Sequence, residues 1–128
     1  MINKNNYYLN DYFDLFNQSN TKEKEYMKTN IYESNNKYII ETDLPGIPKE
    51  QIKINYENGY LTIKALKKPL NINTYIRKEK YEGELKRSFY IGLKKEEEIL
   101  ATYENGVLKI TFNKEDIPKK ESKNIIVS

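Results

Sequence analysis

The side chains that most often carry out chemistry in proteins are missing from this chain. Its 128 residues include no His and no Cys, which removes the commonest general base, the commonest zinc ligands and the thiolate nucleophile. The five glycines are scattered and form no phosphate-binding loop. Carboxylates are frequent, but the run 96–98 (Glu-Glu-Glu) falls in a charged connecting segment, which is typical of a solvated loop. The sequence therefore predicts no enzyme, no metal site and no cofactor.

One charged residue falls in an apolar pattern. Arg87 shares an alternating phase with Leu85, Phe89 and Ile91 in the segment GELKRSFYIG. An arginine in such a phase is costly unless it is paired with a carboxylate. Periodicity leaves two interpretations open. Either the strand is exposed at an edge, with Arg87 reaching water, or Arg87 meets an acidic partner at an interface.

Most of the chain that surrounds Arg87 alternates with a period of two, as β-strands do. The alternation is visible in segments separated by turn residues, at 38–42, 52–56, 61–65, 85–91, 100–103 and 107–112. The long segment 66–83 is less regular, and we expect a short strand at 74–77 within it. About seven or eight short strands without a convincing interior helix indicate an all-β fold, a β-sandwich.

The tetrapeptide Tyr-Glu-Asn-Gly occurs twice, at 56–59 and at 103–106. Asn-Gly is the strongest short hairpin signal, because a type I′ turn needs positive φ at both central residues. We therefore expect two similar hairpins, with these turn residues: Asn58, Gly59, Asn105 and Gly106.

The two ends of the chain lack this alternation. Residues 1–30 are predicted to be a partly disordered arm, 31–115 the folded domain, and 116–128 an extension. Aromatic and apolar residues of the arm are spaced so that a short helix would gather them on one face: Tyr8, Leu9, Tyr12, Phe13 and Phe16. Such a helix is too short to be stable alone, so it needs a partner surface.

Charge and hydropathy limit the partners and the location. The net charge is +3 and the Lys and Glu residues are interspersed, so no specific binding of nucleic acid is expected. No segment approaches the roughly 20 apolar residues of a membrane span, so a membrane partner is not expected. The N-terminus shows no apolar signal region, and we expect a cytoplasmic protein.

Four segments, in this order, resemble the motifs of one family. Residues 43–52 (DLPGIPKEQI), 83–91 (GELKRSFYI), 101–108 (ATYENGVL) and 125–127 (IIV) are similar to conserved segments of the small heat-shock proteins of the α-crystallin family, bacterial type. Leu85 stands where the family usually has Phe. The resemblance implies an immunoglobulin-like β-sandwich, the α-crystallin domain, with two antiparallel sheets.

The resemblance also implies two kinds of contact between subunits. The strands that precede the Asn-Gly turns would form a groove that accepts a C-terminal anchor, Ile125 and Val127, with these walls: Ile52, Ile54 and Leu100. The loop at about 66–83 would exchange a strand with a neighbouring subunit to form a homodimer, and Arg87 would lie at that interface. We expect the interface to include Tyr75, Ile76, Arg77 and Arg87.

The function that the resemblance implies is an ATP-independent chaperone, a holdase that binds unfolding client proteins and works as a dynamic homo-oligomer of dimers. The aromatic arm is the expected client-binding segment. One alternative is a docking module that resembles CS-domain co-chaperones. Another is a β protein that binds single-stranded nucleic acid, to which the 12 tyrosines would contribute stacking surfaces.

Overall fold

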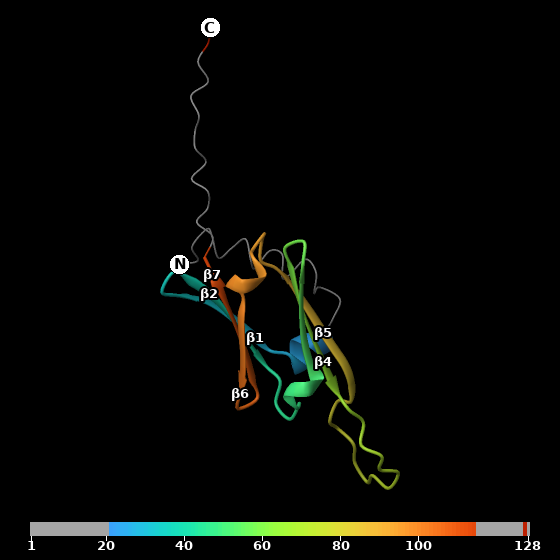
Figure 1. Ribbon diagram of the computed structural model, residues 1–128. Coiled ribbons are helices and arrows are strands. Elements are labelled where there is room, and N and C mark those ends of the chain that lie inside the picture. Colours follow the sequence, from blue (N-terminus) through green and yellow to red (C-terminus); the bar gives the residue numbers. More distant parts are fainter. Residues whose placement is uncertain (1–20, 115–126, 128) are drawn as a thin grey trace.

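A computed structural model of the protein describes residues 21–114 and 127. Two antiparallel sheets pack face to face (Figure 1). The first sheet has the strand order β1-β2-β7-β6, with β1 at Thr29–Ser34, β2 at Lys37–Asp43, β6 at Leu100–Glu104 and β7 at Val107–Asn113. The second has the order β3-β4-β5, with β3 at Ile52–Glu57, β4 at Tyr60–Lys67 and β5 at Gly83–Tyr90. This arrangement confirms the predicted β-sandwich.

Helical structure in the described part of the chain is limited to three short elements. They are α2 at Thr21–Tyr26, the 3-10 helix η1 at Lys49–Gln51 and the 3-10 helix η2 at Glu96–Glu98. The helix η1 lies in the connection from β2 to β3, and η2 lies in the connection from β5 to β6. Both connections cross from one sheet to the other.

The core lies between the sheets and follows the alternation of the sequence. The inward side chains of β2, β4, β5 and β7 are almost completely buried, among them Ile40, Leu61, Ile63, Leu85, Phe89, Ile110 and Phe112. Ile40 pairs with Ile110 across β2 and β7. Removing such side chains from water is the main stabilising contribution of the fold, at about 25 cal/mol per Å² of apolar surface.

Three hairpin turns have positive φ at both central residues. Asn58 and Gly59 join β3 to β4, and Asn105 and Gly106 join β6 to β7. The third turn, at 35–36, joins β1 to β2 and consists of two asparagines with φ of 51° and 63°. Sequence analysis did not single out this Asn-Asn pair, although asparagine tolerates the left-handed region better than most residues.

The two Tyr-Glu-Asn-Gly copies perform the same structural task on opposite sheets. The Tyr56 hydroxyl donates a hydrogen bond to the carbonyl of Gly92 at 2.7 Å, in the connection from β5 to β6. The Tyr103 hydroxyl lies 2.7 Å from the carbonyl oxygen of Leu44 and 2.6 Å from that of Ile47, in the connection from β2 to β3. Each tyrosine therefore fixes one of the two segments that cross between the sheets.

The glycine of each copy contacts the same connections. The carbonyl of Gly59 accepts a hydrogen bond from the Ile91 N–H at 2.8 Å, and that of Gly106 accepts one from the Leu44 N–H at 2.7 Å. A Cβ atom at residue 59 would lie 2.7 Å from the Tyr90 ring, so a larger residue would not fit without displacing it. Each copy of the tetrapeptide thus forms a hairpin turn and also holds one connection between the sheets by hydrogen bonds, a role that we call a clamp.

The structure differs from the sequence-based expectations in two segments. The prediction of a short strand at 74–77 is wrong for the single chain, where residues 68–82 contain no strand. An extended segment needs a neighbouring strand to form ladder hydrogen bonds. At the other end, β1 begins at Thr29, before the predicted domain start, and Met27 is fully buried in the core.

Candidate functional site

Arg87 is buried inside the sandwich, although β5 is an edge strand of its sheet. Its side chain is 3% exposed, which excludes the interpretation that it is exposed at an edge or extends to water. The guanidinium Nη1 donates to the Met27 carbonyl and to the Thr29 hydroxyl, the latter at 3.0 Å. The segment that leads into β1 therefore covers Arg87. Its role at a dimer interface stays a prediction.

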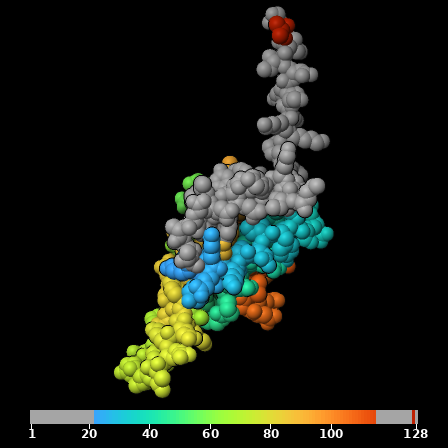
Figure 2. Space-filling view, turned by 180° about the vertical axis from the view of Figure 1, so that it is seen from behind, coloured from blue at the N-terminus to red at the C-terminus, as the bar shows by residue number. Residues whose placement is uncertain are grey.

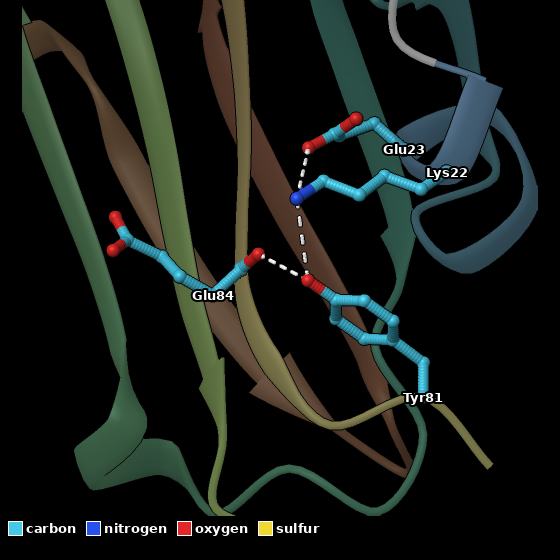
Figure 3. Close-up of polar contacts among 4 residues, drawn as sticks. All are labelled: Lys22, Glu23, Tyr81 and Glu84. Atoms are coloured by element: carbon cyan, nitrogen blue, oxygen red, sulfur yellow. Dashed lines mark hydrogen bonds and ion pairs between the residues drawn. The ribbon is translucent and has the colours of Figure 1, made fainter.

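The base of the long loop is joined to α2 (Figure 3). The Lys22 ammonium donates to the Tyr81 hydroxyl at 3.3 Å, and this hydroxyl donates to the Glu84 carbonyl at 2.8 Å. The hydrogen bond to Tyr81 raises the pKa of Lys22 above its usual value. The rings of Tyr26 and Tyr81 stack with their centroids 5.0 Å apart. Sequence analysis missed this contact because the spacing along the chain gives no sign that residues near 22 and 81 meet.

The loop itself, residues 68–82, extends away from the two sheets (Figure 1), and it protrudes in the opposite view as well (Figure 2). Ile76 is fully exposed and Tyr75 is 39% exposed. The Arg77 guanidinium lies 3.8 Å from the Glu79 carboxylate in a pair that is open to solvent. Three predicted interface residues thus lie together on this loop, and Arg87 lies apart from them in the core.

The predicted groove residues lie on two strands that form sheet edges. β3 and β6 are both edge strands, one in each sheet. Ile52 and Ile54 pair with the buried residues Ala65 and Ile63, so they point inward, yet both are only partly buried. The sandwich is therefore incompletely closed along β3.

On β6 the predicted groove residue, Leu100, does not point toward the core. Leu100 pairs with Thr111 in the outward phase of the sheet and is 60% exposed. Ala101 and Tyr103 pair with the buried residues Ile110 and Leu108, so they hold the inward positions. Ala101 is exposed despite this orientation. Leu100 and Ala101 therefore lie on opposite faces of β6, because side chains alternate between faces. The role of Leu100 as a wall of the groove stays a prediction.

Most of the two arms lies outside the described residues, which include only 21–30 and Val127 of them. The predicted client-binding residues and Ile125 fall in the parts that the structure does not describe, and Val127 is 94% exposed. Among the described residues there is no group of His, Cys, Asp or Glu that could hold a metal ion. A search of the same residues finds no helix long and apolar enough to span a membrane.

Comparison with known proteins identifies the family. Residues 30–128 match the model of the Hsp20/alpha crystallin family. The chain is 37% identical to a probable Hsp20 family chaperone of Onion yellows phytoplasma over 94% of this chain and 92% of the relative. It is 36% identical to heat shock protein HSP.16.4 of Streptococcus thermophilus, over 92% of this chain and 84% of the relative.

Solved structures lead to the same result. A small heat-shock protein from Xylella fastidiosa has a TM-score of 0.61 at 27% identity, covering 80% of this chain and 95% of that one. A protein from Xanthomonas axonopodis, hspA, has a TM-score of 0.58 at 28% identity, covering 68% and 91%. The chain belongs to the Hsp20/alpha crystallin family. The family resemblance stated from the motifs is thereby confirmed, and the family implies a chaperone function in the stress response.

Proposed function

We propose that this protein is an ATP-independent holdase that works as an oligomer of dimers. The observation that carries the proposal is the incompletely closed edge of the sandwich, where the inward side chains of β3 and β6 are only partly covered. Unpaired strand edges and uncovered apolar side chains are the surfaces that bind extended, apolar segments of other chains. Unfolding proteins expose segments of that kind.

The same edge is suited to the C-terminal anchor of a neighbouring subunit. An extended segment could place Ile125 and Val127 along the edges that carry Ile52, Ile54 and Leu100. Burial of these apolar side chains would contribute about 1.5–3 kcal/mol for each anchor residue before ordering costs. A single contact of that strength dissociates readily, whereas many together hold an assembly. The anchor and a client segment would then compete for one surface.

The loop 68–82 is the feature that supports the proposal of a dimer. Its exposed apolar side chains, including Tyr75 and Ile76, have no partner strand in the single chain. Docking the loop against the unpaired edge of β1 in a second subunit would bury these side chains and complete the strand expected at 74–77. The related Xylella protein is described as having a distinct high-order structure.

The test is a heat-aggregation assay without nucleotide. An aggregation-prone client is heated alone, with this protein, and with an equal mass of an inert protein, and light scattering is followed. The proposal predicts suppression at near-stoichiometric ratios. Unchanged scattering at a temperature where circular dichroism shows this protein folded would contradict it. A monomeric mass of this protein alone, measured separately by multi-angle light scattering, would favour the docking-module alternative.

A further inference from the structure

Three lysines form a straight row across the outer face of the three-stranded sheet. Lys53 of β3 pairs directly with Lys64 of β4, and Lys64 pairs directly with Lys86 of β5. All three side chains are exposed. With neighbouring strands about 4.8 Å apart, the row places three positive charges along a line of about 10 Å.

The direct cross-strand partners in this lysine row do not compensate one another's charge. Like charges directly opposite each other on a sheet are destabilising. Within residues 21–114, the three lysines take part in no ion pair. The outer face of the other sheet follows the usual rule, because Lys109 of β7 pairs there with Glu41 of β2. An unrelieved row of positive charge is therefore a local feature of one face, and it would be relieved by an anion.

A shallow hollow lies beside the lysine row. Its volume is about 270 Å³, and Gln51, Lys53, Lys64, Leu66 and Glu84 contribute to its wall. The amide of Gln51 and the two ammonium groups offer hydrogen-bond donors at its rim. The face thus combines aligned charge with a depression that a bound chain could enter.

Two carboxylates restrict the shape of the ligand. Glu84 pairs with Leu66 in the adjacent outward row, and Glu57 pairs with Tyr60 in the outward row at the other end of the sheet. A broad anionic surface such as a lipid bilayer would meet these carboxylates as well as the lysines. A thin chain that lies across the strands, along the row, meets the three lysines and passes only Glu84, which shares the wall of the hollow.

The surroundings also disfavour a single-stranded nucleic acid. Proteins that bind single strands stack the bases on aromatic side chains next to the phosphate contacts. The aromatic pair on this face, Tyr60 and Tyr90, packs edge to face with ring centroids 5.1 Å apart. Tyr60 lies four residues from Lys64 along β4, which is about 13 Å in a strand. No platform adjoins the row.

We propose that the row of Lys53, Lys64 and Lys86 binds a linear chain of phosphates without bases. This inference goes beyond the proposed holdase activity and does not depend on it. Contacts between exposed unit charges are weak individually and are screened by salt. The three contacts act together because one chain spans them.

The test measures the binding of fluorescently labelled inorganic polyphosphate to the full-length protein by anisotropy, at 50 and 200 mM salt. The variant K53Q/K64Q/K86Q is compared with K37Q/K95Q/K109Q, which removes the same charge from exposed lysines outside the row. We expect about fivefold weaker binding for each lysine removed from the row, and about a hundredfold for all three. The control variant should change the affinity little, and binding by the parent should weaken at the higher salt.

Thermal unfolding gives a second readout. Polyphosphate should raise the melting temperature of the parent and of the control variant, and leave that of K53Q/K64Q/K86Q unchanged. Without ligand, this variant should melt no lower than the parent, since its substitutions remove repulsion. Equal losses in the two triple variants, or no binding by the parent at 50 mM salt, would overturn the proposal. Tighter binding of a single-stranded oligonucleotide of equal charge would overturn the choice of a base-free chain.

Discussion

Arg87 is held in the interior by oxygen atoms of the segment that enters β1. Replacing it by alanine leaves the buried Met27 carbonyl without this donor and removes the contact with the Phe89 ring, whose centroid is 5.6 Å from the guanidinium carbon. We expect Arg87→Ala to lower the free energy of unfolding by about 2–3 kcal/mol. Urea denaturation measures this loss. Lys86→Ala, at the exposed neighbouring position, serves as the control and should change stability by less than about 0.5 kcal/mol.

The consequence of Arg87→Ala for assembly is a separate measurement. If the arginine acts only within its own subunit, the variant will keep the parent mass under conditions where it is folded. A weakened dimer at full folding would support the predicted interface role. Sedimentation at several protein concentrations distinguishes these outcomes.

Tyr103 ties β6 to the connection between β2 and β3 through its hydroxyl, which is within reach of two carbonyl oxygens. Tyr103→Phe removes that hydrogen bond and keeps the ring, so we expect a loss of about 1–2 kcal/mol in unfolding free energy. Tyr26→Phe is a matched control, since the partly buried Tyr26 ring stacks on Tyr81 and its hydroxyl makes no hydrogen bond within residues 21–114. An equal effect of both substitutions would contradict the clamp role of Tyr103.

The same hydroxyl predicts a dependence on alkaline pH. Burial raises the pKa of Tyr103, so its neutral form is favoured more strongly in the folded than in the unfolded chain. The stabilisation is fully present below the ordinary tyrosine pKa of about 10 and is lost as the pH rises through the folded value. Stability should therefore fall above about pH 10, and the difference between the parent and Tyr103→Phe should shrink there. A constant difference from pH 8 to 11 would contradict this assignment.

The strands β4 and β5 pair along their full length, up to Lys67 opposite Gly83, and the loop 68–82 then extends from that pair. The loop can therefore be replaced by a two-residue Asn-Gly turn without altering the sheet register. We expect the shortened protein to stay folded by circular dichroism and to lose the dimer. Its mass by light scattering should be that of a monomer. A dimer of unchanged stability would show that the loop does not form the interface.

The strands β2, β4, β5 and β7 were predictable because one face of each is buried and the sequence alternates accordingly. Ile52, Ile54, Leu61 and Ile63 all lie in the expected phase. The orientation of Leu100 was not predictable, because the alternation at 99–103 offers two phases and only pairing with β7 selects one. The covering of Arg87 and the contact of α2 with Tyr81 join residues about 60 positions apart, and no local pattern encodes them.

Assembly beyond the dimer is expected to depend on the C-terminal anchor. The substitutions Ile125→Ser and Val127→Ser, made together, remove the apolar contact with the edges of β3 and β6. We expect the mass in solution to shift from large oligomers towards dimers, as measured by multi-angle light scattering. The substitutions Ser122→Ala and Ser128→Ala, made together in the same extension, are the control. An unchanged mass of the Ile125/Val127 variant would mean that other contacts hold the assembly.

The strand order carries a consequence for how the chain is made. β2 pairs with β1, which precedes it, and with β7, which is synthesised last of all the strands. Lys37 lies opposite Asn113, so the central pairing of the four-stranded sheet joins segments from near the two ends of the domain. The chain must therefore have left the ribosome up to residue 110 before Ile40 has its cross-strand neighbour Ile110. Until then the growing chain exposes the same kind of apolar strand that we propose it protects in others.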